Sequence, residues 1–187
     1  CFLDWTGPWG WLGIAPDGAR GCSAVNSLLY VYALRQAARA ERACGDVAMG
    51  DYWQAKADAV ARAVVAAFWD DARGLVADTR AKVRFSEHAQ CLALLADVLP
   101  PGRAARAFAG LTEATDLAPT TVYFSHYLFE TYSSLRTARL SARSRCRTVW
   151  TARSSGRAWR RRFGRARTRF APPEAAGAYR NSAPATR

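Results

Sequence analysis

Three short segments of the chain combine carboxylates, imidazoles and aromatic rings, and the first is Asp4-Trp5 inside the glycine-rich stretch FLDWTGPWG. A carboxylate accepts hydrogen bonds from sugar hydroxyls, and an adjacent indole covers the apolar face of a sugar ring. Trp9 and Trp11 add aromatic surface to the same stretch. The pattern indicates a carbohydrate contact, but a hydrophobic loop packed on helices, with Asp4 capping a turn, explains it equally well.

The other two segments lie where loops enter expected helices. Glu87 and His88 follow Ser86 in FSEHAQ, where free backbone N–H groups and the helix dipole favour anionic or hydroxyl-rich ligands. Tyr123 and His126 lie in APTTVYFSHY, near the start of the next such helix. Simpler explanations stay open, because Ser86 and Glu87 also suit an ordinary helix cap and His126 suits a helical core.

Outside its loops, the sequence predicts only helices. Residues 1–22 are a loop rich in Gly and Trp, and residues 70–85 form a connecting loop with one short extended piece. No run alternates with period two for long, so no sheet is predicted. The expected helices are Ser23 to Cys44, capped by Ser23; Asp51 to Trp69, capped by Asp51; Ser86 to Val98; Gly102 to Leu111; and one with Pro119 in its first turn.

These helices favour an all-α fold built from helical hairpins. In a helical toroid the loop-to-helix entries of successive hairpins lie on one face. The three polar and aromatic segments would then line one cleft with Asp, Glu, His, Tyr and Trp side chains, which suits a carbohydrate.

Charge divides the sequence in two near Leu135. The whole chain has a formal charge of +12, yet residues 1–135 carry a net charge of −2 and residues 136–187 a net charge of +14. The tail holds 15 Arg and no Lys among 52 residues, a composition that GC-rich DNA encodes when it is read out of frame. We expect a domain at 1–135 and a disordered or frameshift-derived tail at 136–187. The alternatives are a basic arm through which the protein binds nucleic acid, or an unusual helix.

The five cysteines are odd in number and form no CxxC pair, so neither a disulfide framework nor a zinc site is indicated. We expect reduced thiols, most of them packed as small hydrophobic residues. The longest strongly apolar run, Ala63 to Trp69, is too short to span a membrane. No cofactor or metal is expected, the oligomeric state stays open, and the compartment also stays open with the cytoplasm favoured.

Four stretches resemble the catalytic domain of bacterial α-L-rhamnosidases of glycoside hydrolase family 78 and related six-hairpin glycosidases. These stretches are FLDW, FWDDARGLVADT, FSEHAQCLALLADVLP and DLAPTTVYFSHYLFE, and the resemblance covers roughly residues 2–135. It implies part of an (α/α)6 toroid, a terminal rhamnose-like sugar as substrate, and inverting hydrolysis by two carboxyl groups. It also implies that Asp4 and Trp5, and then Glu87, His88, Tyr123 and His126, line the substrate. Toroids of other function, such as a lyase or a terpene cyclase, remain a further possibility.

The sequence departs from the family pattern at both catalytic positions. The family's general acid comes from a motif resembling DERxGWTGD, which this sequence lacks. Its general base lies in a Thr-x-x-Glu-like motif, whereas here the matching region is the Arg-rich tail with Glu174 as its only acid. We therefore assign no catalytic residue and expect an inactive fragment, with about five of twelve helices and exposed apolar faces.

Overall fold

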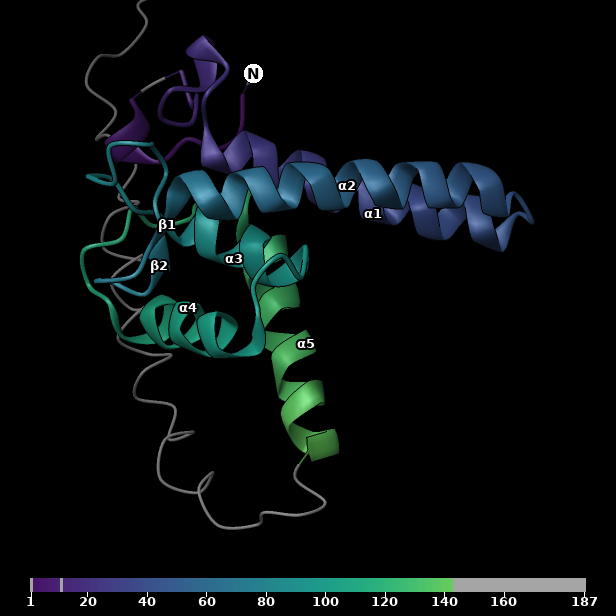
Figure 1. Cartoon of the computed structure of the whole chain (residues 1–187). Coiled ribbons are helices and arrows are strands. Elements are labelled where there is room, and N and C mark those ends of the chain that lie inside the picture. The colour runs from purple at the N-terminus through teal and green to yellow at the C-terminus, as the bar shows by residue number, and fades with distance from the viewer. Residues whose placement is uncertain (1, 11, 143–187) are drawn as a thin grey trace, which may run out of the picture. The chain divides into compact units, whose positions relative to one another are not determined.

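The computed structural model describes residues 2–10 and 12–142, and residues up to Arg139 belong to one compact unit (Figure 1). The helical elements that it describes confirm the all-α prediction. They are the 3-10 helices η1 (Gly7–Trp9) and η2 (Gly18–Arg20) and the α-helices α1 (Ala24–Ala43), α2 (Val47–Phe68), α3 (Glu87–Leu95), α4 (Pro101–Glu113) and α5 (Ser125–Ala142). The expectations of disorder and nucleic-acid binding fall largely on residues 143–187, outside this description.

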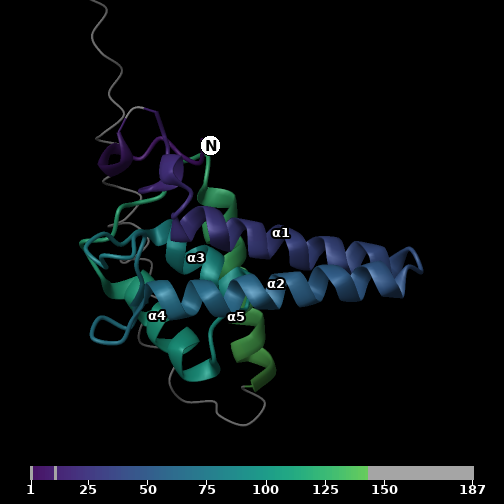
Figure 2. The same ribbon diagram turned by 45° about the horizontal axis from the view of Figure 1, so that its top comes forward.

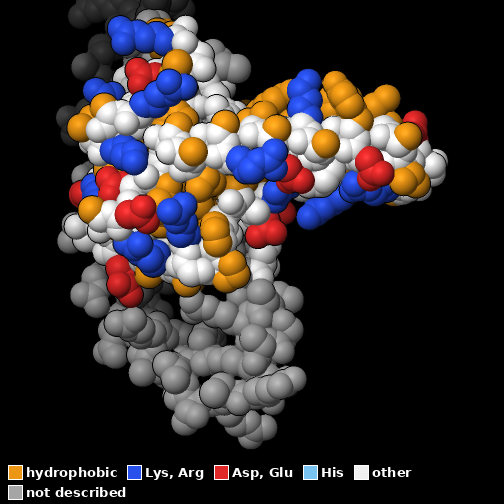
Figure 3. Space-filling view, in the orientation of Figure 1, with side chains coloured by type: hydrophobic (Ala, Val, Ile, Leu, Met, Phe, Trp, Pro, Cys, Tyr) orange, Lys and Arg blue, Asp and Glu red, His pale blue; other side chains and the backbone are white. Residues whose placement is uncertain are grey.

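Helices α1 and α2 run side by side as a hairpin that extends away from the rest of the unit in two views (Figures 1 and 2). Gly45 permits the turn between them, because its φ of 94° is strained for residues with side chains. Val31 and Leu34 of α1 pack with Ala57 and Ala61 of α2. Hydrophobic side chains also lie on the outer surface of the hairpin, as Figure 3 shows.

The starts of α1 and α2 differ from the prediction in their capping. Asp46, and not Asp51, caps α2 by accepting a hydrogen bond from a first-turn N–H at 2.9 Å. Asp51 lies inside the helix and pairs with Arg42 at 2.8 Å. Ser23 occupies the expected position before α1, but its hydroxyl makes no cap. The first N–H of α1 donates instead to the backbone carbonyl of Asp78 at 3.1 Å, a contact between distant segments.

The loop expected at 70–85 contains a small antiparallel sheet that the sequence did not predict. Trp69 in β1 (Trp69–Asp70) pairs with Val76 in β2 (Leu75–Val76). Gln90 of α3 fixes β2, because its Oε1 accepts from the Val76 N–H at 2.9 Å and its Nε2 donates to the Val76 carbonyl at 2.7 Å. Strands of two residues are too short to show a period of two in the sequence.

Helix α3 is buried along most of its length, with every residue from Glu87 to Ala93 inside the unit. Ser86 caps it as predicted, since its hydroxyl accepts a first-turn N–H at 3.2 Å. The helix ends at Leu95, earlier than the expected Val98, and Asp97 turns the chain with a φ of 50°. The polar residues His88 and Gln90 of this helix are buried together with its apolar residues.

The segment 118–121 is not helical and a turn at 122–124 follows it, which corrects the prediction that Pro119 opens the helix. Helix α5 begins at Ser125. The Ala118 N–H donates to the Phe85 carbonyl at 2.9 Å, and the Glu87 N–H donates to the Ala118 carbonyl at 3.0 Å. The segment therefore runs beside the entry to α3, where its backbone makes long-range contacts instead of helical ones.

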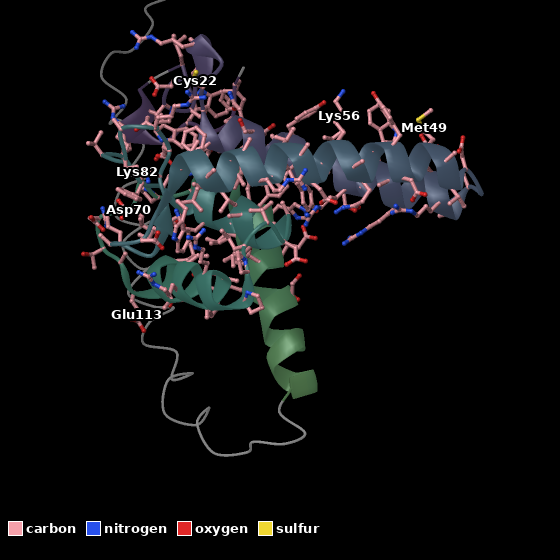
Figure 4. All side chains as sticks on the ribbon, in the orientation of Figure 1. Cys22, Met49, Lys56, Asp70, Lys82 and Glu113 are labelled. Carbon is pink, nitrogen blue, oxygen red and sulfur yellow. The ribbon has the colours of Figure 1, made fainter. Side chains whose placement is uncertain are left out.

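Of the cysteines in the described residues, Cys91 is buried in the core while Cys22 and Cys44 are exposed with free thiols. Cys22 and Cys44 therefore differ from the packed cysteines that the sequence predicts as the majority, and Cys91 agrees with that prediction. Figure 4 shows Cys22 at the loop end of the unit, whereas Met49 and Lys56 lie on the extended part of α2.

Gly110→Ala is expected to lower the free energy of unfolding by about 1–2 kcal/mol, because overpacking a filled core outweighs the gain in helix propensity. A Cβ at Gly110 would overlap the Leu75 side chain, which is 2% exposed. Gly102→Ala in the same helix is the control, since nothing lies within 4 Å of its Cβ position. Urea unfolding of both variants measures the difference, and equal midpoints would contradict this packing.

Candidate functional site

Asp4 lies in a buried hydrogen-bond network that joins three distant segments. Its side chain is 0% exposed, and Oδ2 accepts from the Thr121 backbone N–H at 2.8 Å and lies 2.7 Å from His88 Nε2. Oδ1 accepts a hydrogen bond from the Thr121 hydroxyl. The N-terminal loop is held in place because the Leu3 N–H donates to the Gly13 carbonyl at 2.8 Å. The network thus connects this loop, α3 and the segment before α5.

The network also fixes the charges of Asp4 and His88. Burial opposes ionisation of Asp4, but the hydrogen bonds from His88 and Thr121 more than offset it, so its pKa is lowered. Burial lowers the pKa of His88 as well, and the nearby Asp4 carboxylate opposes this only in part. Because an ionised carboxylate only accepts, a neutral His88 must carry its hydrogen on Nε2. Asp4 is therefore an ionised carboxylate, and both of its oxygens accept hydrogen bonds from other groups of the protein.

Two aromatic rings hold the imidazole of His88 between them. Its centroid lies 4.2 Å from that of Trp9 and 4.5 Å from that of Phe124. His88 Nδ1 is buried and has no hydrogen-bond partner among the described residues. The ring is thus fixed by two tilted aromatic contacts and by its bond to Asp4, which makes it a positioning group in this structure.

Glu87, the residue before His88, binds Thr120 in the same way as Asp4 binds Thr121. It is 5% exposed, and its Oε2 accepts from the Thr120 N–H at 2.9 Å and from the Thr120 hydroxyl at 3.0 Å. Thr120 and Thr121 therefore each bind a carboxylate with both backbone and side chain. These two bonds per residue explain why Thr120 and Thr121 do not join helix α5.

Three aromatic residues form an exposed surface next to this network, which we call the aromatic platform: Phe2, Trp5 and Tyr123. Ring centroids lie 4.5 Å apart for Phe2 and Trp5, 5.3 Å for Phe2 and Tyr123, and 6.4 Å for Trp5 and Tyr123. Trp5 is 63% and Tyr123 62% exposed. Trp5 directly follows Asp4 in the chain, and Tyr123 comes two residues after Thr121, so the buried network holds the backbone on both sides of the platform.

His126 lies apart from these groups. Its side chain is 77% exposed, and its Nε2 is 3.6 Å from Oε2 of Glu130 on the same helix. Its ring packs against Tyr127 at a centroid distance of 5.4 Å. Of the six residues that the sequence singles out, the structure thus gathers Asp4, Trp5, Glu87, His88 and Tyr123 around one network, and it gives His126 contacts within α5.

Asp78 is a buried acid that the sequence did not single out. Its Oδ1 accepts a hydrogen bond from the Ser86 hydroxyl at 2.6 Å, while Oδ2 has no partner within hydrogen-bond distance in the described part of the chain. Burial raises the pKa of Asp78 to about 6, although the Ser86 hydroxyl, Arg84 and the more distant Trp9 indole favour the ionised form. The residue that caps α3, Ser86, is therefore hydrogen-bonded to a carboxyl with a raised pKa, that of Asp78.

Four further residues of the network and platform are not among the six that the sequence singles out: Phe2, Thr120 and Thr121, and also Trp9, which the sequence indicated only as added aromatic surface. All four lie within segments that it marked, since two flank the Asp4-Trp5 pair and two precede Tyr123. A paired Thr-Thr after a proline was the available signal, because hydroxyls beside free N–H groups suit carboxylate binding.

Neither a metal site nor a membrane helix is present in the described residues. They contain no group of three or more His, Cys, Asp or Glu that could hold a metal ion. None of the helices within 2–10 and 12–142 is long and apolar enough to cross a membrane.

Comparison with known proteins supports the fold. A crystal structure of a GH78 family rhamnosidase from Bacillus sp. GL1 superposes with a TM-score of 0.60 at 20% sequence identity. The match covers 88% of this chain and 16% of the rhamnosidase chain. No family model and no curated protein matches the sequence. At this identity the likeness concerns the fold, so the chain is similar in fold to a part of that rhamnosidase.

Proposed function

We propose that the chain is a glycoside hydrolase-like protein of the α-L-rhamnosidase type that binds a terminal deoxysugar on the aromatic platform. The observation that carries this proposal is the platform itself: exposed rings held by a buried hydrogen-bond frame. The likeness in fold to part of a GH78 rhamnosidase supports the proposal from a second direction.

The platform has the chemistry that a deoxysugar requires. A sugar with a methyl group in place of a hydroxymethyl group presents a more apolar ring face, which packs well against indole and phenol rings. Trp5 and Tyr123 offer such faces to solvent, at 63% and 62% exposure. Phe2, 41% exposed, contacts both rings and supports them from one side.

Asp4, Glu87 and His88 act as positioning residues in this proposal. Both oxygens of Asp4 accept hydrogen bonds from within the protein, and Glu87 accepts two from Thr120. Stable frames of this kind fix the orientation of contacting side chains and reduce the entropy lost on binding. His126, whose contacts lie within α5, has no part in the proposed platform.

The proposal assigns binding, and not hydrolysis, to this chain. Inverting hydrolysis needs one carboxyl group to protonate the leaving oxygen and another to activate water across the ring. Asp4 is buried and held ionised, so it can neither donate a proton nor reach a water at the platform. No cofactor enters the proposal. Turnover of a nitrophenyl rhamnoside by the purified chain would contradict this assignment.

Trp5→Ala is expected to weaken binding of methyl α-L-rhamnoside by about tenfold, the effect of losing roughly 1.4 kcal/mol of ring contact. Its stability should stay within about 0.5 kcal/mol of the parent, because an exposed side chain is removed. Isothermal titration calorimetry measures the affinity and urea unfolding the stability.

Tyr52→Ala is the matched control for this prediction. Tyr52 is an aromatic residue on α2 with 55% exposure, three positions after Met49 in the sequence. The control should bind the rhamnoside as the parent does. Equal affinities of the parent and Trp5→Ala would overturn the platform as the sugar site.

A further inference from the structure

A hollow of about 280 Å³ lies between the loop that carries η2 and the segment that leads to α3. None of the three platform residues lines it. Its wall combines apolar and charged groups, among them Trp9, Ile14, Pro16, Asp17, Arg20 and Arg84. The volume lies just below the roughly 300–1,000 Å³ of sites for drug-sized ligands, so it suits a smaller ligand such as one sugar unit.

The two arginines of the hollow form no ion pair within the described residues, although Arg84 lies close enough to the buried Asp78 to favour its ionised form. Within the described residues, neither Arg20 nor Arg84 lies within 4 Å of a carboxylate, and both are exposed. Other arginines of the unit do pair, as Arg73 does with Asp116 at 2.7 Å. The charged residues that line the hollow are Arg20, Arg84 and Asp17, so its wall carries a net positive charge, while the buried Asp78 near Arg84 does not line it. The hollow therefore favours an anion.

The loop on one side of the hollow is held in a fixed shape. The Gly18 N–H donates to the Ala15 carbonyl at 2.8 Å, and the Cys22 N–H donates to the Asp17 carbonyl at 3.3 Å. Gly18 also packs closely, because a Cβ there would lie 3.0 Å from Ile14 Cγ2. A rigid loop presents Arg20 with little loss of entropy on binding.

Trp9 gives the hollow an aromatic wall. The indole is half-buried, and it packs against His88 with centroids 4.2 Å apart while also lining the hollow. An indole face beside guanidinium groups suits a ligand that has both an apolar ring face and a negative group.

We propose that this hollow binds a sugar unit that carries a carboxylate, with the ring against Trp9 and the carboxylate on Arg20 and Arg84. Guanidinium groups bind carboxylates through paired, charge-assisted hydrogen bonds. The inference rests on the proposed function, and it extends that function to an acidic sugar neighbouring the terminal deoxysugar of the ligand.

The test compares D-glucuronate with D-glucose, two rings that differ in the carboxylate, by titration calorimetry on the full chain. Glucuronate should bind about tenfold more tightly, as expected for charge-assisted hydrogen bonds at an exposed site. Arg20→Gln and Arg84→Gln should each remove most of this preference. Arg39→Gln on α1 is the matched control, because Arg39 is also exposed and without an ion pair among the described residues. The Arg-rich tail is the same in every variant and adds equally to each measurement.

A further variant and a further ligand make the test decisive. Ala19→Glu places a carboxylate at the rim, where Ala19 is exposed, and should weaken glucuronate binding without affecting glucose. Equal affinity for the two sugars, or an equal loss in Arg39→Gln, overturns the inference. Inorganic phosphate that binds as tightly as glucuronate, with the same dependence on Arg20, overturns it in favour of a general anion site.

The outcomes also separate this inference from the proposed function. If methyl α-L-rhamnoside binds in a manner that depends on Trp5 but glucuronate shows no preference, only the acidic subsite is wrong. If the rhamnoside does not bind at all, the proposed function fails, whatever the hollow does.

Discussion

Asp4→Asn is expected to lower the free energy of unfolding by about 1.5–3 kcal/mol, because it removes the charge on which the hydrogen bonds of a buried network converge. His88 Nε2, the Thr121 N–H and the Thr121 hydroxyl all donate to the Asp4 carboxylate. An amide keeps the shape of the carboxylate but carries no charge, so the hydrogen bonds from His88 and from the Thr121 N–H become weaker, and the Thr121 hydroxyl has to change from donor to acceptor. Urea unfolding at pH 7 measures the loss.

Asp51→Asn is the control for the loss of a carboxylate. Asp51 also forms an ion pair, with Arg42 at 2.8 Å, but its side chain is 67% exposed. Exposed pairs contribute about 0–1 kcal/mol, so this variant should stay close to the parent. A similar small change in Asp4→Asn would show that the buried network does not hold the N-terminal loop.

The network also sets a direction for pH dependence. The pKa of Asp4 is lowered in the folded protein, so its contribution is present above its usual value of 3.8 and is lost as the pH falls through the folded value. The pKa of His88 is lowered too, so the folded state resists protonation and stability falls as the pH drops below 6.5. Both groups therefore lower the free energy of unfolding as the pH falls. In Asp4→Asn the part of this decrease below pH 3.8, which is due to Asp4, should be absent.

Asp78→Asn is expected to have the opposite effect and to stabilise the protein at pH 7.5 by about 1–3 kcal/mol. The folded pKa of about 6 against 3.8 in the unfolded chain means that ionised Asp78 costs up to about 3 kcal/mol at neutral pH. The amide oxygen of asparagine can still accept the Ser86 hydroxyl, so the cap of α3 is kept. Thermal or urea unfolding at pH 7.5 gives the gain.

The dependence of this gain on pH identifies its cause. A raised pKa makes the folded state bind more protons, so the relative stability due to Asp78 is present at low pH and is lost as the pH rises through about 6. The advantage of Asp78→Asn should therefore shrink by about 2 kcal/mol between pH 7.5 and pH 4.5. Asp116→Asn is the control, at 61% exposure in a pair with Arg73, and should show no such trend. A gain that is the same at both pH values would contradict burial of an ionised Asp78.

The helices were predictable where an apolar stripe repeats with the helical period. Val25, Leu28 and Leu29 recur at helical spacing and lie in α1, and Val60, Ala63, Val64 and Ala67 do the same in α2. The boundaries failed where distant residues decide them. Helix α5 starts late because Thr121 bonds Asp4, which lies 117 positions earlier in the chain. The 2-residue strands depend on Gln90 of α3 for the same reason.

The candidate site was also predictable only where local sequence decides the structure. Residue types and loop positions were enough to mark Asp4, Trp5, Glu87, His88 and Tyr123. They could not say which of these face water, since a carboxylate in a glycine-rich loop looks equally fit to bind a sugar or to bind the protein itself. The structure buries Asp4 at 0% exposure and leaves Trp5 at 63%, so the aromatic residues, and not the acid, offer the surface. Asp78 escaped notice because its burial arises from contacts with distant segments.

The most direct test of the proposed function is a nuclear magnetic resonance titration of the ¹⁵N-labelled chain with methyl α-L-rhamnoside. The account predicts saturable shifts of the Trp5 indole N–H and the Thr121 amide, with the Trp53 indole on α2 unchanged as an internal control. Assignment by Trp5→Phe and Trp53→Phe identifies the two indole signals. A spectrum without saturable shifts, or shifts that appear at Trp53 and spare Trp5, would contradict the aromatic platform as a sugar-binding surface.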